Sequence, residues 1–99
     1  MDNQTFNKVK TKHFQTLEQY VPIVARVHGK SHPEFYNVQK VFSAISEKTK
    51  EADSKIPELN KEFSALRKIT KDYTVPNDVC ESFEAVYTML AELDQAYYA

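Results

Sequence analysis

A heptad stripe of apolar side chains between residues 35 and 56 is the feature that most limits what this chain can fold into. Its members are spaced alternately three and four residues apart: Phe35, Val38, Phe42, Ile45, Thr49, Ala52 and Ile56. This spacing places them on one face of an α-helix, which then packs on a neighbouring helix at about 20°. With one glycine and four prolines in 99 residues, the chain has few of the turns that a β fold needs. We therefore expect an all-α fold.

Three further segments have helical spacing, at about residues 4–28, 57–71 and 78–98. Pro22 interrupts the first of them, so that helix is expected to be kinked or divided there. The connections between the segments are short, and short connections join helices that are antiparallel neighbours. The sequence therefore predicts a short up-down-up-down four-helix bundle, formed as a single domain over residues 1–99.

Several residues are expected to mark the ends of these helices. Gly29 is a natural stop for the first, because glycine takes the left-handed conformation without a Cβ clash. Ser31 and Glu34 have the spacing of a capping box at the start of the second. Pro57 is expected to end the second helix and open the third, and Asn77 or Asp78 can cap the fourth.

Composition excludes several classes of protein. The formal net charge is −1, from 13 basic and 14 acidic residues, which gives no basic surface for nucleic acid. No apolar run approaches the ~20 residues of a membrane span, and the N-terminus lacks the apolar region of a signal peptide. The single cysteine cannot form an internal disulfide and fits a reducing compartment. We expect a cytoplasmic protein with neither nucleic acid nor membrane as a partner.

Two segments resemble one known family. VARVHGKSHPEF at residues 24–35 and RKITKDYTVPNDVC at residues 67–80 are similar to the helix–loop–helix corners of the hemerythrin-like iron–sulfur cluster repair proteins. The resemblance extends over most of the chain. It implies a hemerythrin-like four-helix bundle, which in that family holds a di-iron site among inward-facing histidines and carboxylates.

The ligands of that site are missing from this chain. The family's ligand positions fall on Asn7, Ala52, Ile56 and Tyr98, and the ligand of the third helix is lost around Pro57. None of the three histidines has a glutamate three or four residues later, the spacing that turns both side chains toward a bundle axis. The resemblance therefore implies a metal-free relative with no cofactor. Iron held by atypical or intersubunit ligands is the alternative.

The three histidines each allow two interpretations. His13 lies on the inner stripe of the first helix. It is interpreted either as a partly buried residue bonded to a neighbour or as one ligand of a rebuilt metal site. His28 and His32 flank the first connection. The resemblance assigns them to a structural corner motif, and a metal bound in the loop is the alternative.

Cys80 falls near the start of the fourth helix, a position that favours a negatively charged thiolate. It is interpreted either as a small buried core residue or as a redox-active thiol. No histidine is near it in the sequence, so catalysis by a Cys–His pair has no local support.

A short third helix and an early end to the fourth are expected to leave part of the apolar stripe uncovered. The predicted interface residues are Ala52, Ile56, Tyr97 and Tyr98. We expect a homodimer, or a complex with another helical protein. The sequence thus predicts a non-enzymatic protein that acts through interaction or regulation. The alternative is an iron-binding protein of cluster repair or of the response to nitrosative or oxidative stress.

Overall fold

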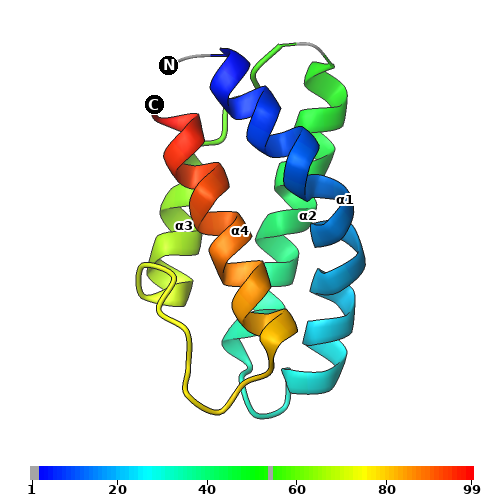
Figure 1. Cartoon of the computed structure of the whole chain (residues 1–99), viewed down its shortest axis with the longest axis vertical. Helices are drawn as coiled ribbons and strands as arrows, with labels where there is room; N and C mark the ends of the chain where they lie inside the picture. Colours follow the sequence, from blue (N-terminus) through cyan, green and yellow to red (C-terminus); the bar gives the residue numbers. More distant parts are fainter. Residues whose placement is uncertain (1–2, 54) are drawn as a thin grey trace.

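The computed structural model describes residues 3–53 and 55–99, and the regular secondary structure in this part of the chain is entirely α-helical. The helices are α1 (Asn3–His28), α2 (Glu34–Ala52), α3 (Asn60–Thr70) and α4 (Glu81–Tyr97). They lie side by side, and each runs in the opposite direction to the one before it (Figure 1). The predicted all-α, up-down-up-down four-helix bundle is therefore confirmed for the described residues.

The order of the helices brings two loops together at one end of the bundle. α1 packs against α4 and α2, and α2 packs against α3. The α1–α2 and α3–α4 connections lie at the end of the bundle opposite the two termini (Figure 1). Residues from the first third of the chain therefore meet residues from the last third at that end. Among the described residues, none of the helices combines the length and the apolar character needed to cross a membrane.

Each helix turns one apolar face toward a shared core. The largest fully buried side chains are Tyr87, Tyr97, Phe6, Phe35, Phe63, Phe83, Leu17, Ile45, Leu59, Leu66, Leu90 and Leu93. Burial of each such side chain stabilises the fold by about 1.5–3 kcal/mol. On α2 the buried face is the one the heptad stripe predicts, from Phe35 through Thr49.

The buried face of α1 does not include every apolar residue of the helix. Leu17 and Val21 are fully buried, whereas Val27 is 63% exposed. The 3.6-residue period carries the buried face from Val24 to His28, so Val27 lies outside it. α1 is continuous through Pro22, so this proline does not divide the helix.

Gly29 follows α1 for a different reason from the one expected. Its backbone is not left-handed. A Cβ at this position would instead overlap the carbonyl oxygen of Ala25 and the ring of Tyr36. Glycine is needed here because α2 begins so close to the end of α1.

The helix ends also differ from prediction. α2 begins after Pro33 without a side-chain cap, so Ser31 and Glu34 form no capping box. α3 begins at Asn60, not at Pro57. α4 begins at Glu81, and Cys80 occupies its N-cap position in place of Asp78.

The apolar stripe is covered within the chain itself. The hydroxyl of Tyr97 accepts a hydrogen bond from the Leu59 amide at 2.8 Å and donates one to the Pro57 carbonyl at 3.1 Å. Tyr97, expected at an interface, is 1% exposed and closes the core beneath the α2–α3 connection. Ala52 and Ile56 are half-buried, and Ile56 packs on the core. The early end of α4 therefore does not expose this part of the stripe, because the α2–α3 connection folds back over it.

Candidate functional site

Four of the residues that carry chemistry lie at the end of the bundle opposite the termini. His28 ends α1, His32 lies in the α1–α2 connection, and Asp78 and Cys80 lie just before α4. Glu34, the first residue of α2, completes the group. We call these five residues the corner cluster.

His28 and Cys80 form a pair. The Nε2 atom of His28 lies 3.2 Å from the Sγ atom of Cys80, although 52 positions separate the residues. The thiol is exposed, so Cys80 is not the buried core residue considered as one interpretation. The imidazole packs edge-on against Phe83, with ring centroids 5.6 Å apart. It is thus held where it can accept the thiol proton, or donate a hydrogen bond to the thiolate.

Cys80 is the N-cap residue of α4, and its Sγ atom accepts no hydrogen bond from the amides of the first turn. Its own carbonyl accepts a hydrogen bond from the Glu84 amide at 3.2 Å, as in the first turn of a helix. The free amides and the positive end of the helix dipole lie at that terminus. The contact with His28 is therefore the influence on the sulfur that the structure shows.

His32 connects the two loops. Its Nδ1 atom lies 3.1 Å from Oε2 of Glu34, and its Nε2 atom lies 3.0 Å from Oδ1 of Asp78. Its ring also packs on Phe83, with centroids 5.5 Å apart. Both ring nitrogens are thus occupied by carboxylates, and His32 fixes the α3–α4 loop beside α2.

His13 lies elsewhere in the molecule. It is on α1, its side chain is 12% exposed, and its Nε2 atom pairs with the carboxylate of Glu92 on α4. Local spacing could not indicate this partner, because His13 and Glu92 are 79 positions apart in the chain. Within residues 3–53 and 55–99, no group of three or more histidine, cysteine or acidic side chains is arranged to hold a metal ion.

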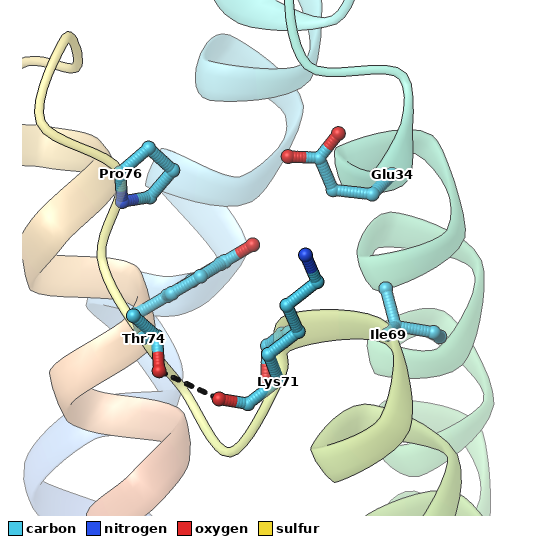
Figure 2. Close-up of a pocket in the computed structure, with 7 residues that line it drawn as sticks. Glu34, Ile69, Lys71, Thr74 and Pro76 are labelled. Atoms are coloured by element: carbon cyan, nitrogen blue, oxygen red, sulfur yellow. Dashed lines mark hydrogen bonds between the residues drawn. The ribbon is translucent and has the colours of Figure 1, made fainter.

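A pocket of about 410 Å³ adjoins the corner cluster and shares Glu34 with it. Its other principal walls are Ile69 and Lys71 at the end of α3, Thr74 and Pro76 in the α3–α4 loop, and Tyr87 on α4. Figure 2 shows the side chains of Glu34, at the start of α2, and Lys71, in the loop after α3, reaching into the same space. No motif in the sequence predicts this pocket.

Tyr87 supplies the most deeply buried polar group of the pocket. The residue is 1% exposed, and its ring stacks on Phe35 with centroids 6.3 Å apart. The described residues provide no hydrogen-bond partner for its hydroxyl. Burial, and secondarily the charge of Glu34, raise the pKa of Tyr87 to about 12. The hydroxyl therefore remains protonated near neutral pH, and it can donate a hydrogen bond.

The loop that carries Lys71 is unusual in its backbone. Lys71, Asp72 and Tyr73 have successive φ values of 52°, 58° and 62°, a left-handed conformation that side chains disfavour. Hydrogen bonds hold this backbone, and three of them involve Thr70 or Thr74. The Tyr73 amide donates to Oγ1 of Thr70 at 2.7 Å, the Thr74 amide donates to the Thr70 carbonyl at 3.0 Å, and Oγ1 of Thr74 donates to the Lys71 carbonyl at 2.6 Å. The reversal directs Lys71 into the pocket (Figure 2).

The sequence did contain a signal for the His28–Cys80 pair. An up-down-up-down bundle places the end of its first helix and the start of its fourth at the same end. Local spacing around Cys80 could not show this, because the pair forms only through the topology of the whole chain.

No family model matches this chain, and no curated protein or solved structure was found to be similar to it. The resemblance to the cluster repair proteins therefore rests on the sequence itself, which is most distinctive in the two corner segments.

Proposed function

We propose that this protein is a metal-free, non-enzymatic regulator of the hemerythrin-like cluster repair lineage, and that the thiol of Cys80 is its switch. The observation that supports this most strongly is the 3.2 Å contact between Nε2 of His28 and Sγ of Cys80 at an exposed helix N-terminus. The single cysteine suits a reducing cytoplasm, where the thiol is kept free until an oxidant arrives.

The proposed chemistry is thiol–disulfide exchange. His28 takes the proton from Sγ of Cys80, and the thiolate attacks one sulfur of an incoming disulfide. A new S–S bond forms to Cys80, the S–S bond of the incoming disulfide breaks, and the departing thiolate takes the proton from His28. Because the chain has one cysteine, the product joins Cys80 to another molecule. The exchange therefore attaches that molecule covalently to the protein.

The corner cluster can transmit this attachment to the fold. A group bonded to Sγ displaces the His28 imidazole from its present contact and lies beside the bond between His32 and Asp78 at 3.0 Å. That bond fixes the α3–α4 loop. Modification of Cys80 would thus loosen the start of α4 and change the surface at that end of the bundle.

A second copy of the chain, or another helical protein, is the proposed partner. Ile23 and Val27 are four residues apart on α1 and are 45% and 63% exposed. Residues at this spacing share a helix face, so together they offer a small apolar surface.

Sedimentation analysis at micromolar concentration tests the homodimer. A monomer with the same sedimentation coefficient at all concentrations, before and after oxidation, would exclude it.

The direct test of the switch uses oxidised glutathione and the intact chain. We expect a mixed disulfide at Cys80, detected by intact mass, together with chemical-shift changes in the α1–α2 and α3–α4 loops. Cys80→Ser should show neither change. The regulator proposal fails if wild type forms the mixed disulfide while the amide shifts of both loops stay unchanged, because the attachment would then have no structural effect.

A further inference from the structure

The pocket beside the corner cluster contains groups that the thiol chemistry does not use. Lys71 and Glu34 carry opposite charges and enter the same space (Figure 2). Among the described residues, Lys71 and Glu34 form no ion pair with each other, and Lys71 forms none with any other residue. Glu34 uses one carboxylate oxygen to bind His32. The pocket therefore presents a cation and an anion that face a common volume without neutralising each other directly.

The hydroxyl of Tyr87 is the second observation that points to a ligand. It belongs to a residue that is 99% buried, it lines the pocket, and no described residue bonds to it. Among the described residues, this oxygen is not one of the fully buried atoms without a partner, so it reaches the pocket space. A bound acceptor there can take its hydrogen bond.

We propose that this pocket binds a small zwitterion, a free molecule that carries one carboxylate and one ammonium group. The carboxylate pairs with Lys71 and accepts a hydrogen bond from the hydroxyl of Tyr87, and the ammonium group pairs with Glu34. A simple anion would be repelled by Glu34, and a simple cation would be repelled by Lys71. Only a ligand with both charges satisfies the two side chains, and a volume of about 410 Å³ accommodates a molecule of amino-acid size.

The shape of the pocket supports recognition of a compact ligand. Ile69 and Pro76 give it apolar walls, and hydrogen bonds within the loop from Thr70 to Thr74 hold the backbone of Lys71. The walls are therefore formed before a ligand arrives, and the Lys71 side chain is the part that becomes ordered on binding.

The test is a titration of the ¹⁵N-labelled full chain, followed by amide chemical shifts. Glycine, β-alanine and γ-aminobutyrate present the same two charges at increasing separation, and acetate and methylammonium each present one of them. We expect saturable shifts at Lys71, Thr74 and Tyr87 with at least one zwitterion, and at least about tenfold weaker binding of both single-charge probes.

Two variants and two controls assign the contacts. Tyr87→Phe keeps the ring and loses only an unpartnered hydroxyl, so it should fold normally and weaken binding about tenfold. Lys71→Met should weaken it at least as much, whereas the exposed-site controls Tyr36→Phe and Lys68→Met should not. The proposal is overturned if no zwitterion gives saturable shifts, if acetate binds as tightly as the zwitterions, or if Tyr87→Phe binds like wild type. None of these outcomes depends on Cys80, so they are separate from the test of the thiol switch.

Discussion

Arg67 on α3 donates two hydrogen bonds to the carboxylate of Asp94 on α4, from Nε at 2.9 Å and from a terminal nitrogen at 3.0 Å. The hydroxyl of Tyr73 donates a third at 2.7 Å. The Asp94 side chain is 9% exposed, and the guanidinium of Arg67 also lies 5.0 Å from the centre of the Tyr98 ring. One carboxylate thus connects α3, α4 and the left-handed loop that leads to the pocket.

Removing Arg67 tests this connection. Arg67→Met leaves the nearly buried carboxylate of Asp94 with Tyr73 as its remaining side-chain donor. We expect the free energy of unfolding to fall by about 2–3 kcal/mol, because a buried charge loses most of its hydrogen bonds. Urea denaturation measures the change, with exposed Lys68→Met on the same helix as the control. If the two variants lose stability equally, Asp94 does not depend on Arg67.

Stability at high pH should reveal the buried tyrosines. Burial raises the pKa of Tyr87 to about 12, and burial is also the leading cause of the raised pKa values of Tyr73 and Tyr97. In the unfolded chain a tyrosine ionises near pH 10, so between about pH 10 and 12 the folded state holds protons that the unfolded state has lost. Stability is therefore fully present below pH 10, and it declines as the pH rises through this range.

Denaturation at pH 8 and at pH 11 measures this decline. Tyr87→Phe should reduce it, because phenylalanine has no proton to lose. The exposed-site control Tyr36→Phe should leave the decline as large as in wild type. An equal free energy of unfolding at the two pH values would show that these hydroxyl groups ionise as readily in the folded chain as in the unfolded one.

Gly29→Ala should destabilise the α1–α2 corner. The added Cβ would overlap the Ala25 carbonyl oxygen and the Tyr36 ring, so the backbone has to shift. We expect a loss of about 1–3 kcal/mol, as for other over-packed positions. Adding Tyr36→Ala removes the overlap with the ring but keeps the overlap with the Ala25 carbonyl oxygen. The double variant should therefore recover only part of the stability that Gly29→Ala loses. Full stability of Gly29→Ala would contradict the close approach.

Metal content tests the proposed absence of a cofactor. After anaerobic loading with iron and desalting, we expect no stoichiometric iron and no di-iron absorption. Retained iron with oxo-bridged absorption would contradict the proposal. If His13→Ala or His28→Ala then abolished the retained iron, that histidine would be assigned to a site built from atypical or intersubunit ligands.

The helices and their order could be predicted from the sequence because they follow from local spacing. The stripe from Phe35 to Thr49 already determines which face of α2 is buried. The end of that helix was harder to predict, because Ala52 and Ile56 continue the period while the chain turns after Ala52. Asp53 has a positive φ of 55° directly after the helix, and further along the hydroxyl of Tyr97 binds the backbone of residues 57 and 59.

The site was less predictable because its residues come together only in three dimensions. His28 and Cys80 were each singled out, but their contact joins opposite ends of the sequence. Tyr87 gave no signal, since a tyrosine near a heptad stripe resembles any other core aromatic. Its unpartnered hydroxyl became visible only once the packing around it was known.

The rate at which Cys80 reacts with iodoacetamide tests the central claim most directly. We compare wild type with His28→Gln, and with His32→Gln as a matched control in the same corner cluster, from pH 6 to pH 9. If His28 assists ionisation of the thiol, His28→Gln should react roughly tenfold more slowly near neutral pH, while His32→Gln keeps a rate closer to that of wild type. Equal rates for wild type and His28→Gln, with both proteins folded, would contradict the account.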